Sequence, residues 1–129
     1  NGSLIITVIV TDGIFSDSTS FTLSVIAVND APVLAAIADT STAEDTPLVL
    51  PLEGEDVDGD DLTFSTLSAS PSDVSVIISD NTLTMTPAEN FNGDVQISVT
   101  VTDSVYTDNT VFTLTVMLNF GTRIWFARL

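Results

Sequence analysis

Residues 97–116 read ISVTVTDSVYTDNTVFTLTV, and this stretch decides the fold. Apolar residues alternate with Ser and Thr on both sides of a polar segment that begins at Asp103. Alternation with a period of two is typical of half-buried antiparallel strands, and a short polar segment between two such runs is suited to a hairpin loop. The stretch therefore predicts two long strands joined by a hairpin.

The same pattern occurs a second time near the N-terminus. Residues 6–25, ITVIVTDGIFSDSTSFTLSV, align without gaps on residues 97–116 at an offset of 91, with eleven of twenty positions identical. Solenoid units run to about 20–50 residues, so a period of this length indicates an array of domains. We expect the last two strands of a preceding repeat at 1–28 (strands near 3–12 and 20–28), a linker at 29–32, a complete domain at 33–118 and an atypical C-terminal tail at 119–129.

Other segments of the complete domain alternate in the same way. Thr-rich faces oppose apolar faces in each of them, and Asp80-Asn81 suits a two-residue hairpin turn because Asp and Asn tolerate positive φ. The predicted strands lie near 33–38, 48–52, 62–64, 74–78, 83–85, 95–101 and 111–118. Seven short strands without a helix predict an all-β protein, a seven-stranded antiparallel immunoglobulin-like β-sandwich.

The charge of the chain is strongly one-sided. Eighteen Asp and Glu face two Arg and no Lys, for a formal net charge of −16, and both Arg lie in the last seven residues. Such a surface repels phosphate backbones and anionic membranes, so we expect no nucleic-acid binding and no membrane insertion. Cations are the natural partners, although solubility or adaptation to a salty medium also explains an acidic surface.

Two residue types that carry much of enzyme chemistry are absent. The chain contains no Cys and no His, which excludes thiolate and imidazole metal ligands, a thiol nucleophile and the usual general base. Paired carboxylates could in principle form a glycosidase-like dyad, but no cleft-forming segment accompanies them. We therefore expect no enzymatic activity.

The acidic residues are expected at the two ends of the sandwich. If consecutive strands alternate in direction, the loops sort into two groups. One end collects Asn29, Asp30, Asp56 to Asp61, Asp80 and Asp103, and the other collects Asp39, Glu44, Asp45, Glu89 and Asn90. Each close carboxylate pair costs on the order of 1 kcal/mol even in water, and a bound cation reverses this cost.

Calcium is the cation that these residues favour, because only oxygen ligands are available. The sequence DVDGDD (56–61) is not an EF-hand loop, since Gly59 occupies the fourth position instead of the sixth and Leu67 stands where the twelfth-position Glu is required. A calcium site must therefore combine separate loops. Within this stretch we interpret Asp60 and Asp61 as a solvated rim.

Several of these motifs carry a family resemblance. VNDAP (28–32), AEDTPLVL (43–50), DVDGDDLTF (56–64) and LTMTPAENFNGDVQISVTVTD (83–103) resemble the cadherin-like tandem repeats of large bacterial surface and secreted proteins. The resemblance implies calcium at domain junctions, with ligands from the linker, from a DxD motif after the second strand and from an Asp after the sixth. It implies the metal ligands Asn29, Asp30, Asp56, Asp58 and Asp103 at one junction, and Glu44 at the opposite one.

The function that this resemblance implies is a calcium-binding structural and adhesive spacer in an extracellular or cell-surface protein. Its expected partners are calcium ions and neighbouring repeats or identical subunits. Two alternatives remain open. Phe15 and Tyr106 occupy equivalent loop positions and could stack on surface glycans, although aromatic side chains that cap the core are the favoured interpretation. The N-terminal hairpin could also be donated to another subunit and build an extracellular filament.

Overall fold

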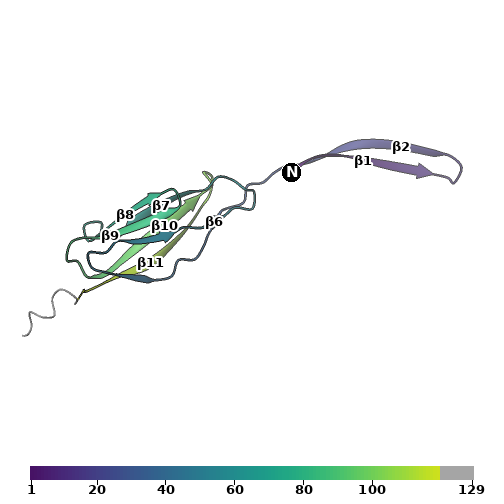
Figure 1. The fold of residues 1–129 in the computed structure, drawn as a ribbon. Coiled ribbons are helices and arrows are strands. Elements are labelled where there is room, and N and C mark those ends of the chain that lie inside the picture. The colour runs from purple at the N-terminus through teal and green to yellow at the C-terminus, as the bar shows by residue number, and fades with distance from the viewer. Residues whose placement is uncertain (120–129) are drawn as a thin grey trace, which may run out of the picture.

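The computed structural model describes residues 1–119, and in this range the chain is all-β, as predicted. No helix long and apolar enough to cross a membrane occurs among these residues. Figure 1 shows a sandwich and, extending away from it, the N-terminal hairpin. The strands are β1 (Gly2–Thr11), β2 (Ser16–Val25), β3 (Val33–Leu34), β4 (Thr40–Ala43), β5 (Leu48–Pro51), β6 (Gly54–Glu55), β7 (Thr63–Ser68), β8 (Val74–Ser79), β9 (Thr82–Pro87), β10 (Gly93–Thr102) and β11 (Thr107–Met117).

The sandwich consists of two main sheets that enclose one apolar core. One sheet has the order β4-β11-β10-β7 and the other the order β5-β9-β8, while β3 and β6 form a short two-stranded sheet. Inward-facing residues of β10 and β11 pack against the inner faces of β8 and β9. The buried core consists of Leu34, Leu52, Val74, Leu83, Met85, Val95, Ile97, Val99, Val101, Phe112, Leu114 and Val116.

The first predicted strand, near 33–38, is wrong in its extent. The structure keeps only Val33–Leu34 of it as β3, which is antiparallel to β6, and adds β4 after it, which pairs in parallel with Leu114–Met117 of β11. The expected purely antiparallel pairing therefore holds everywhere except at β4. Two carboxylates connect β11 to the segment that contains β3 and β4. Asp108 of β11 accepts the Leu34 N–H through Oδ2 at 2.9 Å. Asp39 accepts the N–H of Thr113, in β11, through Oδ1 at 2.8 Å.

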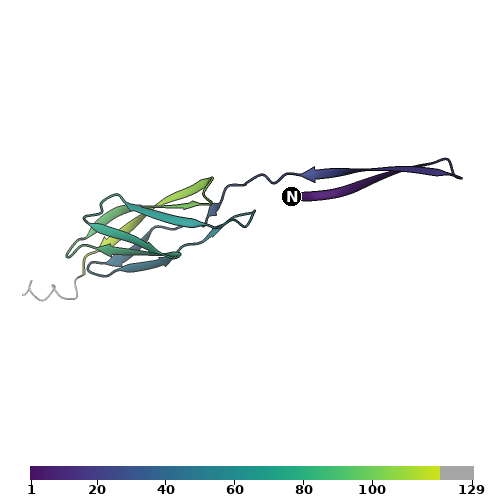
Figure 2. The ribbon, with the colours of Figure 1, turned by 90° about the horizontal axis from the view of Figure 1, so that it is seen from above.

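The N-terminal hairpin repeats the register of β10 and β11. Gly2 pairs with Val25 as Gly93 pairs with Val116, and the offset of 91 holds along both ladders. The second strand of the hairpin, predicted at 20–28, begins and ends earlier in the structure, at Ser16 and Val25. The reason is that only four residues separate Thr11 from its partner Ser16, so the pairing starts directly after the turn. Figure 2, viewed from above, also shows the hairpin projecting away from the sandwich.

The predicted turn at Asp80-Asn81 is confirmed. Ser79 pairs with Thr82, which leaves two residues in the turn between β8 and β9, and Asp80 adopts φ of 53°. Positive φ is tolerated by Asp better than by most non-glycine residues. Since the turn fixes the register of the β8–β9 pair, it places Leu83 and Met85 on the core face.

The repeat supplies a matched test of the core. Leu114→Ala removes a fully buried side chain, so we expect the free energy of unfolding to fall by about 2–5 kcal/mol. Leu23→Ala changes the equivalent residue of the exposed hairpin, so a change within about 0.5 kcal/mol is expected. Urea unfolding followed by circular dichroism measures both, and equal losses in the two variants would contradict the assignment of the core.

Candidate metal centre

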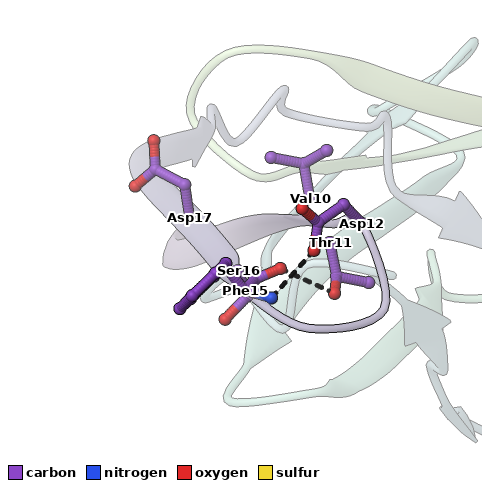
Figure 3. A pocket seen from close by; sticks show the side chains of 6 residues that line it. All are labelled: Val10, Thr11, Asp12, Phe15, Ser16 and Asp17. Atoms are coloured by element: carbon purple, nitrogen blue, oxygen red, sulfur yellow. Dashed lines mark hydrogen bonds between the residues drawn. The ribbon is translucent and has the colours of Figure 1, made fainter.

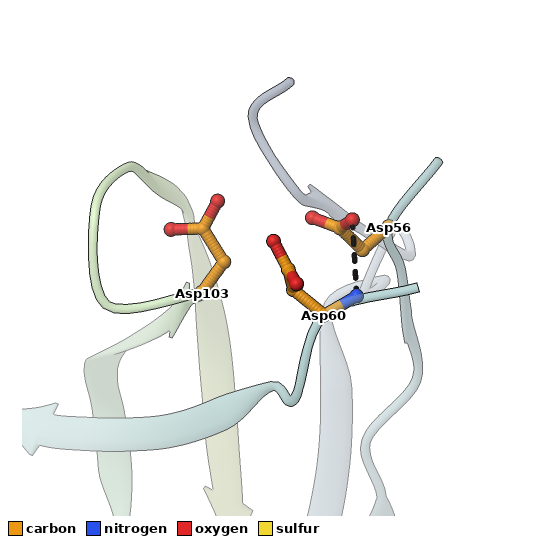
Figure 4. A group of neighbouring side chains, drawn as sticks. All are labelled: Asp56, Asp60 and Asp103. Carbon is orange, nitrogen blue, oxygen red and sulfur yellow. Dashed lines mark hydrogen bonds between the residues drawn. The ribbon is translucent and has the colours of Figure 1, made fainter. Parts of the chain in front are cut away.

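Three carboxylates meet at the end of the sandwich that faces the N-terminal hairpin. One oxygen each of Asp56, Asp60 and Asp103 lies within 4.8 Å of the others. Asp56 and Asp60 belong to the loop between β6 and β7, and Asp103 follows β10 directly. Figure 4 shows the three side chains converging from these two loops. We call them the acidic cluster.

Asp56 organises its own loop. Its Oδ1 accepts the N–H of Asp58 at 2.8 Å and the N–H of Asp60 at 3.3 Å. Gly59 follows with φ of 78°, a conformation that strains other side chains, and its N–H donates to the Asp56 carbonyl oxygen at 3.2 Å. The second oxygen, Asp56 Oδ2, is buried and accepts no hydrogen bond from any described residue. One half of this carboxylate therefore shapes the loop, while the other half faces the cluster without a donor.

Asp103 organises the loop between β10 and β11. Its Oδ1 accepts the N–H groups of Val105 at 2.7 Å and Tyr106 at 2.6 Å, and its side chain is only 6% exposed. The bond from the Tyr106 N–H is the largest influence that lowers the pKa of Asp103, with smaller help from Asn29 and Val105 against the opposing effect of burial. Asp103 therefore carries its charge at neutral pH.

The linker is bonded to both loops. Asn29 Nδ2 donates to Asp103 Oδ2 at 2.7 Å, and the Asp30 N–H donates to Asp58 Oδ2 at 2.8 Å. An open hollow beside these bonds is lined by Asn1, Ala27, Val28, Asn29, Asp58 and Asp60. The acidic end of the domain thus continues directly into the segment that connects it to the hairpin.

Asp60 experiences the crowding of charge most strongly. Although Asp60 is exposed, loss of hydration beside the neighbouring loops raises its pKa, and the negative charges of its neighbours, first Asp56 and then Asp58, Asp103 and Asp61, raise the pKa further. Residues 1–119 contain no Lys or Arg that could compensate these charges. In the absence of a cation the cluster is therefore a repulsive arrangement.

The structure brings together five of the six residues that the resemblance suggested as ligands. Asn29, Asp30, Asp56, Asp58 and Asp103 lie at one end and are connected by the hydrogen bonds above. Asp60, interpreted from the sequence as part of a solvated rim, is exposed, and one of its oxygens also lies within 4.8 Å of one oxygen each of Asp56 and Asp103. The turn at Gly59 folds Asp60 back toward Asp56. A glycine within this acidic run is typical of a tight turn, and it could have indicated that Asp60 lies close to Asp56.

The sixth residue, Glu44, lies at the opposite end. Its side chain is 1% exposed, and Oε1 accepts the N–H of Asn119 at 3.2 Å. Asp45 and Asn90 lie nearby as the sequence suggested, since the Asn90 N–H donates to Asp45 Oδ1 at 2.8 Å. Most of the tail predicted at 119–129 lies outside the described residues, so a junction site for Glu44 stays a prediction.

The tip of the N-terminal hairpin reproduces the Asp103 loop. Asp12 Oδ1 accepts the N–H groups of Ile14 at 2.9 Å and Phe15 at 2.8 Å, and these bonds, the Phe15 bond first, lower the pKa of Asp12. Figure 3 shows the open hollow at this tip, with Asp12 and Phe15 among its lining residues. Phe15 is 78% exposed and Tyr106 48% exposed, so these two aromatic side chains do not cap the core as the favoured sequence interpretation held.

The sequence of the sandwich matches a known protein family. Residues 28–117 match the cadherin-like domain family. The chain belongs to this family. The matched range begins at Val28, one residue before the linker, and ends with the last strand, β11. No curated protein matches the sequence.

Solved structures share the fold with this cadherin-like domain at low sequence identity. A variant of an endo-fucoidan hydrolase from glycoside hydrolase family 107 aligns with a TM-score of 0.57 and 20% identity over 92% of this chain, which spans only 19% of the enzyme. A chimeric titin fragment aligns with a TM-score of 0.51 and 12% identity over 72% of this chain and 100% of its own. Titin domains in complex with telethonin align with a TM-score of 0.50 and 17% identity, covering 91% and 62% of the two chains. These likenesses support the immunoglobulin-like fold alone.

The crowding at Asp60 has a measurable pH dependence. Because the pKa of Asp60 is raised in the folded state, its ionisation lowers stability as the pH rises from about 4 upward. We expect Asp60→Asn to melt at a higher temperature than the parent protein at about pH 7 in chelator, with the difference disappearing near about pH 3. Thermal melts at both pH values measure this.

Glu53→Gln serves as the control, because it removes one negative charge from the same acidic stretch outside the cluster. Its effect on the melting temperature at neutral pH should be smaller than that of Asp60→Asn. A melting temperature of Asp60→Asn below that of the parent protein at neutral pH in chelator would contradict a repulsive cluster.

Proposed function

We propose that this domain is a calcium-binding cadherin-like repeat that acts as a structural and adhesive spacer in an extracellular or cell-surface protein. The observation that carries the proposal is Asp56 Oδ2, a buried carboxylate oxygen without a hydrogen-bond donor among the described residues. It belongs to a cluster in which two further carboxylates lie within 4.8 Å. A buried oxygen of this kind is costly unless a proton donor or a cation compensates it.

The donor set fits calcium. Every candidate ligand is an oxygen, and calcium accepts six to eight oxygen ligands in flexible geometry, whereas magnesium demands a near-ideal octahedron and retains several waters. Asp56, Asp60 and Asp103 would supply carboxylate oxygens, with Asp58 and the linker residues Asn29 and Asp30 beside them. The chain has no Cys or His for the softer transition metals.

A cation at this position would act on the linker. Asn29 is bonded to Asp103 and Asp30 to Asp58, so the two loops and the linker already form one connected unit. A cation shared by the carboxylates would replace their mutual repulsion with common coordination and hold both loops against the linker. This favours a spacer role, in which calcium fixes the angle between consecutive repeats.

The same residues favour a non-catalytic role. Asp56 and Asp103 each use one oxygen to accept backbone N–H groups of their own loops, as structural turn-forming carboxylates do. An extracellular location suits a site of this kind, because extracellular calcium modules bind with Kd of about 10⁻⁴–10⁻³ M.

Calcium should stabilise the protein by mass action. At about 10 mM CaCl₂, Kd values of about 10⁻⁴–10⁻³ M correspond to roughly 1.4–2.7 kcal/mol of added stability. We expect the melting temperature to rise with calcium and to return to its starting value when chelator is added, as measured by differential scanning calorimetry.

Matched variants make this test specific to the cluster. Asp56→Asn keeps an oxygen that can accept the loop N–H groups but removes the charge, so it should lose most of the calcium-induced increase. Glu53→Gln should keep it. The proposal fails if the parent protein shows no increase at millimolar calcium, or if both variants respond equally.

A further inference from the structure

The strand β8 is the outer strand of its sheet and lacks the features that usually protect a sheet edge. Among residues 1–119 it pairs only with β9. Its six residues, VSVIIS, include no charged residue, no Pro and no Gly. An unprotected edge is a template for another strand, and natural proteins block such edges with charges, prolines or covering segments. The edge of β8 is therefore a candidate interaction surface.

The edges on the other side of the sandwich are protected. The strand β5 lies between Pro47 and Pro51, which have no N–H to donate to a further strand. The open edge of β11 is covered beside β4, where Asp39 accepts the Thr113 N–H. The unprotected side of the sandwich thus consists of β8 and the neighbouring edge strand β7, which is also uncharged.

The pairing with β9 determines which backbone groups of β8 face the open edge. The Ala88 N–H donates to the Asp73 carbonyl oxygen at 2.7 Å, so these two residues form a hydrogen-bonded pair. Such pairs alternate along an antiparallel ladder. The residues of β8 that bond to β9 are therefore Ser75, Ile77 and Ser79. Val76 and Ile78 turn their N–H and C=O groups away from β9, toward the open edge.

The sequence of β8 is nearly symmetric. Residues 75–79 read SVIIS, so serine and β-branched apolar residues follow in the same order in both directions. An antiparallel strand of the same sequence, centred on Ile77, would place serine opposite serine and Val76 opposite Ile78. Because Val76 and Ile78 have the open backbone groups, this register forms hydrogen-bonded pairs on both sides of Ile77.

The outer face of the sheet fits the same register. Ile77 is 65% exposed and Val49 is 55% exposed, and Thr84 lies between them as the ladder partner of both. In a sheet continued by a second copy, the two Ile77 side chains would be direct cross-strand neighbours. Apolar β-branched pairs of this kind stabilise a sheet, since each side chain shields the other from water.

Charge also favours this register. The formal net charge of −16 makes most of the surface of one copy repel that of another. In the pairing centred on Ile77, Asp73 lies opposite Asn81. Asp80 lies opposite Val74, so no carboxylate that flanks β8 faces another. The edge of β8 is thus a place where two acidic copies can approach.

We propose that the edge of β8 is an interaction surface for a second copy of this chain. The two β8 strands would pair antiparallel about a twofold axis at Ile77 and join their three-stranded sheets into one continuous sheet. The association is lateral and does not depend on calcium.

The position of the edge suits contact between separate chains. In Figure 1 the strand β8 runs along the sandwich. The linker meets the domain at Asp103, where Asn29 is bonded. The strand β11 ends near Glu44, whose N–H donates to the Met117 carbonyl oxygen at 2.8 Å. Repeats joined in one chain are attached at these two ends, so the side that carries β8 is left to another chain.

Single cysteines test the proposal, because the chain contains no Cys. In the proposed register the two copies of residue 77 form a pair without hydrogen bonds, with Cα atoms about 4.5 Å apart, which suits a disulfide. In chelator under mild oxidation, we expect Ile77→Cys to form covalent dimers at least about tenfold faster than Val49→Cys. Val49 is the matched control, since it is exposed on the same face at the other edge of the sheet. Non-reducing electrophoresis over time measures both rates.

Two further variants test the register. Ser75 of one copy lies opposite Ser79 of the other, whereas the two copies of Ser75 are about 14 Å apart. Ser75→Cys and Ser79→Cys should therefore cross-link rapidly when mixed, and each should cross-link slowly alone.

A charge at the axis should abolish the association. Ile77→Lys places two like charges directly opposite each other, and because the side chain is exposed, the melting temperature should stay close to that of the parent protein. At about 1 mM protein, a Kd of about 1 mM places about half of the chains in dimers. Sedimentation at this concentration in chelator should show dimers of the parent protein and of Val49→Lys, and monomers of Ile77→Lys.

Three outcomes would overturn the proposal. The first is equal cross-linking of Ile77→Cys and Val49→Cys. The second is cross-linking of Ser75→Cys alone as fast as in the mixture with Ser79→Cys. The third is equal sedimentation of Ile77→Lys and Val49→Lys.

Discussion

The apolar face of β10 and β11 is the constraint on which the rest of the structure depends. The strand β10 lies between β7 and β11, and its inward residues Val95, Ile97, Val99 and Val101 are all buried. A shift of one residue in this register would turn the whole face to solvent, so the ladder tolerates little slippage. The points where these two strands begin and end also determine where the loop that contains Asp103 lies.

That constraint also creates the electrostatic conflict at the acidic end. Because β10 must end at Thr102, Asp103 is carried into the end of the sandwich where the loop after β6 delivers Asp56 and Asp60. Backbone N–H groups and the Asn29 amide offset part of the charge of Asp103 and Asp56, but Asp60 is left with a raised pKa. This repulsion lowers the stability of the domain at one end, and it is the physical argument for the calcium site that we propose.

Much of this could be predicted from particular residues. The alternation in β10 and β11 indicated the long hairpin, and the direction of successive strands placed Asp56 and Asp103 at one end, because loop parity needs no coordinates. The role of Asp60 could not be predicted in this way, since it depends on the φ of Gly59 and on the bond from the Asp60 N–H to Asp56. The strand β4 was also missed, because the pairing of Thr40–Ala43 depends on which edge of β11 is open in space.

The sequence by itself determined the alternating faces, the offset of 91 and the concentration of carboxylates, because each of these depends only on the order of residues along the chain. The tertiary structure decided which carboxylate oxygens lie within 4.8 Å of one another, which oxygen of Asp56 lacks a donor and which of two nearly identical hairpins is buried. The physical reason is that these properties depend on packing between segments distant in sequence. The residues of β1–β2 and β10–β11 are almost the same, and only the presence of β3 to β9 beside one of them distinguishes a core from an exposed surface.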